Sequence, residues 1–178
     1  MITKNNCNNT PSGDGGIIRH ATKDDVPQIL EIYNDAIINT TAVYYDEPLS
    51  LETWNKWFED RMKNNFPVFV SVENNVVTGF STYGHFVERE GYRFTVEHSV
   101  YVAEKFKGRG ISKQLMQAII DDAKQKKYHV MIGKIDAENG ISIELHKKFG
   151  FEEVGHLKQA GFKFGRWLDV KILQLMLV

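Results

Sequence analysis

The sequence of 178 residues is 42% hydrophobic and 25% charged, with a formal net charge of −1 at pH 7, which is typical of a single soluble globular domain. The near-neutral charge argues against nucleic acid as the main partner. The only cysteine, Cys7, excludes a disulfide framework and a cysteine metal site, and no apolar run approaches the roughly 18 residues of a membrane span.

No signal peptide precedes the fold, so we expect a cytoplasmic protein without a membrane partner. Residues 1–16 are rich in Asn, Gly, Ser and Thr and lack apolar periodicity. They predict a flexible N-terminal arm, followed by a single folded domain over residues 17–178.

The domain begins with a short strand and two helices. Residues 17–20 predict the strand, and Thr22 then caps a helix. Apolar residues follow at helical spacing, namely Val26, Ile29, Leu30, Tyr33 and Ile37. The segment 39–49 breaks this period and predicts a loop with aromatic residues. A second helix begins at Ser50 or Thr53, and its apolar stripe contains Trp54, Trp57, Phe58 and Met62.

Three strands come next. Residues 68–72 and 76–83 flank an Asn-containing turn and predict an antiparallel hairpin. A charged connection, residues 85–91, leads into a long strand over residues 92–102. The clearest helix in the chain follows at residues 111–127, with lysines near its C-terminal end, where the helix dipole favours cations.

The remaining segments alternate in the same way. Residues 129–135 predict a strand and residues 139–149 a helix. Two closing strands, residues 151–154 and 170–177, flank a loop rich in glycine and aromatic residues over 161–167.

This order of elements predicts the fold class. Strands and helices alternate in the second half of the chain, which indicates an α/β (α+β) fold with a mixed, partly parallel sheet of about seven strands flanked by about four helices. Parallel strands at residues 100–102 and 130–135 would form a crevice at their carboxyl ends, where ligands tend to bind.

A glycine turn joins the strand at 92–102 to the helix at 111–127. The backbone N–H groups around Gly108 and Gly110 and the positive end of the helix point at the same place, which would cradle an anion. The turn matches neither G-x-G-x-x-G nor G-x-x-x-x-G-K-[ST]. Taken alone, it is explained equally well as a structural connection.

A second motif favours the functional interpretation. Residues 139–151, NGISIELHKKFGF, have the layout N-x-x-S-x-x-L-H-x-x-x-G-F. Together with the turn at 107–112, KGRGIS, this sequence resembles the GNAT superfamily of acyl-CoA-dependent N-acetyltransferases. The corresponding motifs of that family are [QR]-x-x-G-x-[GA] and N-x-x-[AS]-x-x-L-Y-x-x-x-G-F. Lys107 and Ser112 depart from the first motif, but neither removes a backbone donor.

Within this superfamily, the sequence resembles the phosphinothricin and methionine sulfone/sulfoximine acetyltransferases. The resemblance covers residues 17–178 and is carried by YND at 33–35 with TT at 40–41, TVEHSVYV at 95–102 and GFKFGRWLDV at 161–170. It implies acetyl transfer from acetyl-CoA to the α-amine of a small amino acid or analogue, and a homodimer.

The resemblance also implies where acetyl-CoA binds. Backbone groups of the long strand would bind the carbonyl oxygen and the pantetheine arm, the glycine turn the pyrophosphate, and an asparagine the pantetheine region. The residues concerned are Val100, Tyr101, Val102, Gly108, Arg109, Gly110, Ile111, Ser112, Lys113 and Asn139. No metal is expected, because the histidines lack the spacing of ligands.

Two residues are candidates for proton transfer. Glu97 stands before the apolar half of its strand and is assigned as the base, although a surface carboxylate is the alternative. His146 occupies the motif position where many GNAT enzymes have a Tyr that protonates the departing thiolate, although a helix-surface histidine is the alternative. Strand alternation lets at most one of Glu97 and His98 face the substrate, and we assign Glu97.

The acceptor amine is expected to belong to a small molecule with a carboxylate. Arg89 and Arg93, with Glu90 and Gly91 between them, flank a strand connection and are candidates to bind that carboxylate, although solvated charge explains them as well. Tyr33 is a candidate for the side-chain pocket. The competing hypotheses are a GNAT enzyme for another amine, such as a polyamine or a peptide N-terminus, and a non-catalytic acyl-CoA-sensing module.

Overall fold

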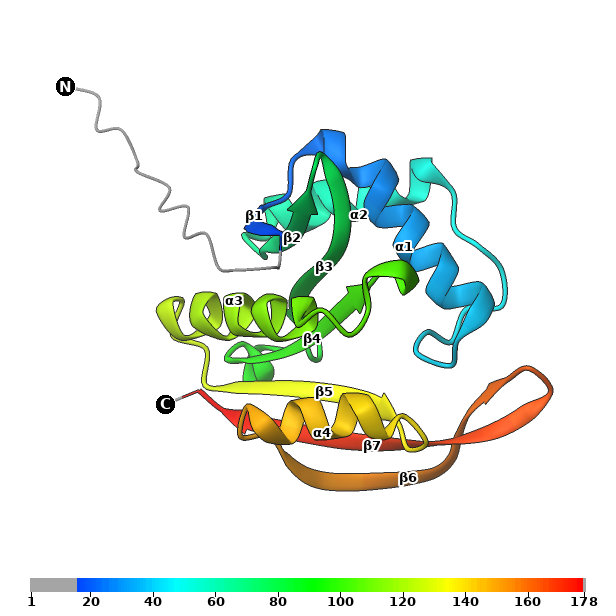
Figure 1. Ribbon diagram of the computed structural model, residues 1–178. Coiled ribbons are helices and arrows are strands. Elements are labelled where there is room, and N and C mark those ends of the chain that lie inside the picture. Colours follow the sequence, from blue (N-terminus) through cyan, green and yellow to red (C-terminus); the bar gives the residue numbers. More distant parts are fainter. Residues whose placement is uncertain (1–15, 178) are drawn as a thin grey trace.

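A mixed sheet of seven strands forms the centre of the computed structural model, which describes residues 16–177 (Figure 1). The expected N-terminal arm therefore lies outside the described residues, apart from Gly16. The strand order is β1-β2-β3-β4-β5-β7-β6. The strands are β1 (Ile17–His20), β2 (Val68–Glu73), β3 (Val76–His85), β4 (Thr95–Val102), β5 (Val130–Asp136), β6 (Glu152–Lys163) and β7 (Arg166–Met176).

Four α-helices flank the sheet in the described part of the chain: α1 (Val26–Asn39), α2 (Leu51–Lys63), α3 (Ile111–Gln125) and α4 (Gly140–Lys148). Three short 3₁₀ turns connect other elements: η1 (Lys23–Asp25), η2 (Glu90–Tyr92) and η3 (Glu104–Phe106). None of the helices in residues 16–177 has the length and apolar character that a membrane crossing requires.

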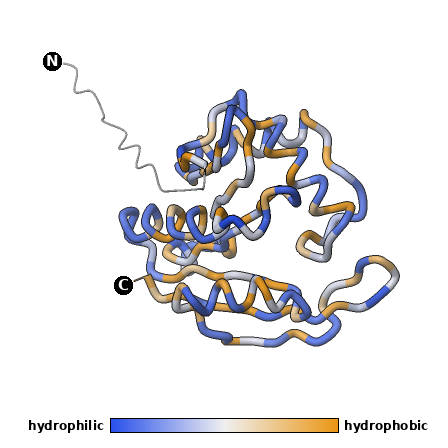
Figure 2. The backbone as a smooth tube through the Cα atoms, viewed as in Figure 1, coloured by the Kyte–Doolittle hydropathy of each residue, from blue (hydrophilic) through white to orange (hydrophobic). Residues whose placement is uncertain are grey.

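The helices cover the two faces of the sheet in pairs. On one face, α1 and α2 pack on β2 and β3 through a buried cluster that includes Ile29, Trp54 and Phe80. On the other face, α3 and α4 pack on β4, β5 and β7 through Met116, Ile143 and other buried residues. The helices show hydrophobic and hydrophilic residues in alternation, as expected for elements buried on one side (Figure 2).

The topology confirms the expected fold class. β4 and β5 are parallel neighbours, and the other five neighbouring pairs of the sheet are antiparallel. The strand expected at residues 92–102 begins only at Thr95, because residues 90–92 close a 3₁₀ turn.

The expected loop at residues 161–167 is wrong. β6 continues to Lys163 and β7 already begins at Arg166, so only two residues form the turn. Phe164 and Gly165 both have positive φ, at 50° and 73°, which is the combination that joins two strands tightly. The hairpin extends beyond the sheet towards the segment that follows α1 (Figure 1).

Candidate active site

β4 and β5 diverge in the middle of the sheet. Their parallel register covers three pairs and ends at Glu97 with Ile132. β4 then continues to Val102 with β3 on its other edge, and β5 continues to Asp136 with β7 on its other edge. Within residues 16–177, the facing edges beyond this point form no ladder with each other. Their backbone N–H and C=O groups are therefore available to a ligand.

The three strand residues expected to bind acetyl-CoA lie on this open part of β4. Val100 packs towards the α3 side, and Tyr101 packs towards α1, where its ring is 5.1 Å from that of Phe80 and 5.3 Å from that of Tyr33. Burial raises the pKa of Tyr101 to about 12, so this side chain is neutral. The side chains of these residues are held by packing, and the ladder with β3 leaves the backbone groups of alternate residues facing the open edge, where a ligand can contact them.

The glycine turn has the backbone geometry expected of an anion cradle. Gly108 and Gly110 have φ of 77° and 78°, and a Cβ built on either would meet no atom within 4 Å. Gly110 is the N-cap residue of α3. Among the described residues, no acceptor lies on the backbone N–H groups of residues 108–112. Five free donors at the start of a helix of 15 residues fit a pyrophosphate.

The other residues of the cradle support its shape. The side chain of Ile111 is buried and anchors α3, Ser112 is half-buried, and Lys113 is exposed. Arg109 lies 2.9 Å from a carboxylate oxygen of Glu73, an ion pair that an anionic ligand would compete for. The cradle therefore offers backbone donors and one guanidinium.

Asn139 has a structural function in addition to the expected one. It is the N-cap residue of α4, and its side-chain oxygen accepts a hydrogen bond from the Ser142 N–H at 3.1 Å. The amide NH₂ of Asn139 is the group left for a ligand.

Glu97 stands where β4 and β5 separate. Its side chain is 29% exposed, and one carboxylate oxygen lies 2.9 Å from the Lys134 ammonium. The alternation of β4 places it on the same face as Ser99 and Tyr101, which is the face covered by α1 and α2.

His146 lies on the opposite face of the sheet, at the same level. Its Nδ1 is 2.6 Å from the carbonyl oxygen of Ser142, and its Nε2 is 3.0 Å from Nε2 of His98. His98 in turn has its Nδ1 2.9 Å from the carbonyl oxygen of Ile132. The structure thus separates the two expected proton-transfer residues and joins one of them to a second histidine.

A glycine makes room for the two imidazoles. A Cβ at Gly133 would lie 2.8 Å from Cε1 of His98 and 3.2 Å from Nε2 of His146, closer than side chains normally approach. Gly133 is the first β5 residue after the last pair with β4. The histidines therefore lie at the base of the divergence between the strands.

A pocket of about 300 Å³ lies on the α1 and α2 face, next to Ser99 and Tyr101. Aromatic side chains dominate its lining, and its cation is Arg61; the lining residues are Tyr33, Tyr45, Leu49, Thr53, Trp54, Trp57, Arg61, Phe80, Thr82, Ser99 and Tyr101. Such a pocket suits a small molecule with an apolar part and a negative charge.

Arg61 is held rigidly in this pocket. Its guanidinium carbon is 5.6 Å from the ring centres of both Trp57 and Phe66, and its Nη1 donates to the Tyr83 carbonyl at 3.3 Å. Among the described residues, its buried Nε has no hydrogen-bond partner. Burial lowers the pKa of Arg61, and the carboxylates of Asp60 and Glu97 oppose this shift. Sequence reasoning missed Arg61, because a lone arginine on a helix carries no motif.

The expected substrate residues lie in and around a second cavity, of about 550 Å³, which shares Arg61 with the first. Arg89, Glu90 and Arg93 line it, and Arg93 donates to the Glu90 carbonyl at 3.0 Å. Gly91 is exposed and does not line it. Tyr33 lines the aromatic pocket instead, so the structure places the expected substrate residues in two neighbouring cavities. Residues 16–177 contain no group of three or more His, Cys, Asp or Glu side chains that could hold a metal ion.

Comparison with known proteins assigns this arrangement to a family. Residues 18–172 match the family model described as an acetyltransferase (GNAT) domain. The chain therefore belongs to the GNAT acetyltransferases, and it is an N-acetyltransferase.

Curated relatives are similar over most of their length. An L-methionine sulfoximine/L-methionine sulfone acetyltransferase of Pseudomonas aeruginosa is 44% identical over 90% of this chain and 94% of its own. A phosphinothricin N-acetyltransferase of Alcaligenes faecalis is 30% identical over 88% of this chain and 80% of its own.

Solved structures agree with this assignment. An N-acetyltransferase from Staphylococcus aureus superposes with a TM-score of 0.90 at 46% identity, covering 90% of this chain and 98% of its own. A putative acetyltransferase from Salmonella typhimurium, solved with its cofactor acetyl-CoA, has a TM-score of 0.89 at 42% identity, covering 90% and 93%.

Proposed function

We propose that this protein transfers an acetyl group from acetyl-CoA to the α-amine of a small amino acid or analogue of the methionine sulfone, methionine sulfoximine or phosphinothricin type. One observation carries the proposal. The divergence of β4 and β5 brings an open backbone edge, Glu97 and an aromatic pocket with a half-buried arginine to one place. The names of the relatives point to the same acceptors.

Acetyl-CoA supplies the acetyl group as a thioester when it is bound. The N–H groups at the start of α3 and the cradle from Gly108 to Lys113 would hold its pyrophosphate. The open edge of β4 at Val100, Tyr101 and Val102 would hydrogen-bond the pantetheine arm, and the Asn139 NH₂ would contact the same arm. The N–H groups of residues 108–112 can do this without any rearrangement, because they have no competing acceptors among the described residues.

Glu97 would act as the base on the acceptor side. Its carboxylate lies on the face of the aromatic pocket and can accept the proton that the attacking amine must lose, directly or through one water. His146 lies at the base of the divergence between β4 and β5 and would hold, at Nε2, the proton that the leaving sulfur requires. The two residues act on opposite faces of the sheet, which suits a reaction in which one proton leaves and another arrives.

The acceptor would lie in the aromatic pocket with its carboxylate at Arg61. Arg61 lines the pocket, and its guanidinium offers donors and a positive charge to a carboxylate. Arg89 and Arg93, in the adjoining cavity, would add positive charge around the same carboxylate. Tyr33 would contact the acceptor's side chain, and Glu90 and Gly91 would shape the entrance.

A screen of thiol release tests this function. Acetyl-CoA would be offered with methionine sulfone, methionine sulfoximine, phosphinothricin and other amino acids, with polyamines and short peptides alongside. We expect turnover with the amino-acid analogues and none with their esters, whose missing carboxylate charge leaves Arg61 unpaired. Turnover with polyamines or peptide N-termini alone would support the alternative that the protein is a GNAT enzyme for another amine. Binding of acetyl-CoA without any turnover would support the alternative of a non-catalytic sensing module.

We also propose a homodimer in the cytoplasm. The β6–β7 hairpin exposes several large apolar side chains, among them Phe162 at 54%, Phe164 at 58% and Trp167 at 61%. Apolar patches of this kind mark interfaces between proteins. Light scattering after gel filtration should give twice the chain mass, and Trp167→Glu should reduce it; a monomeric wild-type protein would refute the proposal.

A further inference from the structure

His98 and His146 form a closed chain of hydrogen bonds. Each Nδ1 faces a carbonyl oxygen, of Ile132 at 2.9 Å for His98 and of Ser142 at 2.6 Å for His146. The two Nε2 atoms face each other at 3.0 Å. Both rings are buried, with 7% and 6% exposed, and all four ring nitrogens are therefore engaged.

These contacts fix the number of ring protons. A carbonyl oxygen can only accept, so each Nδ1 must carry a hydrogen. The contact between the two Nε2 atoms requires one further hydrogen. Two neutral imidazoles have two ring hydrogens in total, one fewer than these three contacts need. All three contacts can be hydrogen bonds only when the pair carries one additional proton and therefore one positive charge.

Within residues 16–177, the charged groups near the pair are either engaged with other groups or exposed. Glu97 precedes His98 in the sequence, and Lys134 follows Gly133. These two residues pair with each other on the opposite face of the sheet. Tyr83, the β3 partner of His98, donates its hydroxyl hydrogen to Asp122. The charged neighbours on α4 and β6 are exposed; they are Lys147, Lys148, Glu152 and Glu153. In the described part of the chain, apolar groups such as Phe151 complete the surroundings of both rings.

We propose that His98 is a positioning residue for acetyl transfer, and that it shares one proton with His146 at the point where β4 and β5 diverge. The use of this proton in catalysis rests on the proposed function, whereas the shared proton itself does not. His98 acts through His146, because its own ring nitrogens face only the Ile132 carbonyl and the other imidazole.

Burial makes the shared proton easy to release. Burial lowers the pKa of His98, and the neighbouring His146 adds to this effect, so the pair does not take up a second charge. Burial also lowers the pKa of His146, against the contact with Ser142, which raises it. Both shifts disfavour charge on the rings, so we expect the pair to hold at most one proton beyond the two of the neutral imidazoles.

The proton balance of the reaction follows. The amine nitrogen forms a bond to the acetyl carbon and loses a proton to Glu97, while the bond from that carbon to sulfur breaks. His146 gives the shared proton to the sulfur, which leaves as a thiol. The pair is then one hydrogen short and regains it from solvent, and the proton on Glu97 returns to solvent.

Nuclear magnetic resonance of the ligand-free protein tests the shared proton without any assay of activity. Long-range correlation spectra of ¹⁵N-histidine-labelled protein report whether each ring nitrogen is protonated, over about pH 5 to 8. We expect both Nδ1 atoms to be protonated, both Nε2 atoms to be intermediate, and a single midpoint for both rings. A bare Nδ1 in either ring at every pH, or two separate midpoints, would overturn the proposal. His129→Gln, which alters an exposed histidine, serves for assignment and as the control.

Two variants separate positioning from packing. Phe at position 98 keeps the stacking on Phe151 but offers no acceptor to His146, whereas the Gln amide oxygen can accept its Nε2 hydrogen. We expect His98→Phe to lower kcat about tenfold or more, with the KM for acetyl-CoA unchanged. As the pH rises, the kcat of this variant should also begin to fall at a lower pH than in the wild type, because protonated His146 is less stable without its partner.

His98→Gln should restore part of both effects. Equal pH profiles for the two variants, at equal thermal stability, would show that His98 only fills space and would overturn its positioning role. Absence of turnover with every amine would instead refute the proposed function and leave the resonance result standing.

Discussion

The proposed chemistry depends most on Glu97, which is the last β4 residue paired with β5 and is proposed as the base. Glu97→Gln keeps the shape of the side chain but cannot accept the amine proton. We expect kcat to fall roughly 10²-fold or more, with the Kd for acetyl-CoA little changed. Steady-state kinetics and calorimetry measure the two quantities.

The matched control for this variant is Glu52→Gln, which removes an exposed carboxylate paired with Lys56 on α2. It should leave kcat as in the wild type. Undiminished turnover in Glu97→Gln would exclude Glu97 as the base.

Gly108 tests the cradle. Its φ of 77° is unfavourable for any residue with a Cβ, and a side chain there would enter the space where the pyrophosphate is proposed to lie. Gly108→Val should therefore weaken acetyl-CoA binding strongly, which calorimetry measures. Gly165→Val is a matched control, because Gly165 has a similar φ of 73° and equally open space in the β6–β7 turn. An unchanged Kd in Gly108→Val, or an equal loss in both variants, would argue against the cradle.

At this scale the sequence motifs make Glu97, His146 and the glycine turn candidates, because each stands at a fixed spacing from its neighbours. The same motifs could not indicate the contact between His98 and His146, which are 48 positions apart and meet only because Gly133 leaves space. Strand alternation correctly predicts that Glu97 and His98 face opposite sides of the sheet, but it assigns no function to His98.

At the scale of elements, the β6–β7 hairpin is tied to α1 by a buried lysine. Lys163 is 2% exposed, and its ammonium donates to the carbonyl oxygens of Ile37 at 2.6 Å and Val43 at 2.5 Å. Ile37 lies in the last turn of α1, where helix carbonyls lack internal partners. The lysine therefore completes the end of the helix and fixes the hairpin against the segment after it.

Replacement of this lysine should loosen the hairpin. Lys163→Met has a similar length but leaves two buried carbonyls without a donor, which we expect to cost about 1–3 kcal/mol in the free energy of unfolding. Urea denaturation measures the loss. Lys158→Met, at an exposed position of the same strand, should change the stability by far less. Equal stability of the two variants would mean that Lys163 is not an anchor.

The hairpin is also the element that sequence reasoning described least well. Gly161, Phe162 and Trp167 were interpreted as a loop because glycine and aromatic residues cluster there. The structure places all three in strands, and Gly161 is needed because a Cβ there would lie 2.6 Å from the Tyr44 ring. The helices were located more accurately, since their 3.6-residue period extends over several turns.

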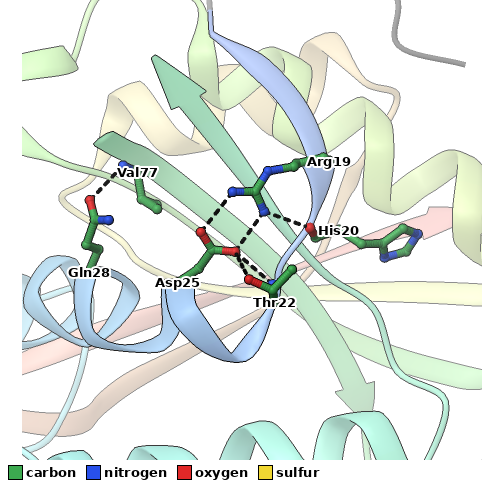
Figure 3. A network of polar contacts seen from close by, with 6 residues as sticks. All are labelled: Arg19, His20, Thr22, Asp25, Gln28 and Val77. Carbon is green, nitrogen blue, oxygen red and sulfur yellow. Dashed lines mark hydrogen bonds and ion pairs between the residues drawn. The ribbon is translucent and has the colours of Figure 1, made fainter. Parts of the chain in front are cut away.

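At the scale of the molecule, an ion pair ties the first strand to the first helix. Arg19 donates to both carboxylate oxygens of Asp25 at 2.7 and 2.9 Å, and Thr22 donates to the same carboxylate through its backbone N–H and hydroxyl (Figure 3). Burial of Asp25 raises its pKa, but the hydrogen bonds from Arg19 and Thr22 outweigh this and hold the pKa below its usual value.

This shift makes stability depend on pH. Because the folded-state pKa of Asp25 is lowered, its contribution is present above the unfolded pKa of about 3.9 and is lost as the pH falls through the folded pKa. Asp25→Asn should lower the free energy of unfolding by about 1–3 kcal/mol at neutral pH and flatten its decline below about pH 4. Urea titrations at several pH values measure both effects, with exposed Asp24→Asn as the control. An unflattened decline in Asp25→Asn would assign the acid sensitivity elsewhere.

The overall topology was predictable because strands and helices alternate regularly after Thr95, and the parallel pair β4–β5 follows from that alternation. The point at which the two strands separate was not predictable, since no residue type marks the end of a parallel register. The pockets depend on that point and on where Arg61 lies, so the acceptor side could be outlined but not built from sequence.

The open edges of β4 and β5 have a consequence for how long the folded protein persists in the cell. Unpaired strand edges invite pairing with other chains, and here they lie in the middle of the sheet. A ligand that fills the gap stabilises only the folded chain, by about 2.7 kcal/mol when its concentration is 100 times its Kd. The supply of acetyl-CoA in the cell would then govern how long each molecule survives, as well as how fast it works.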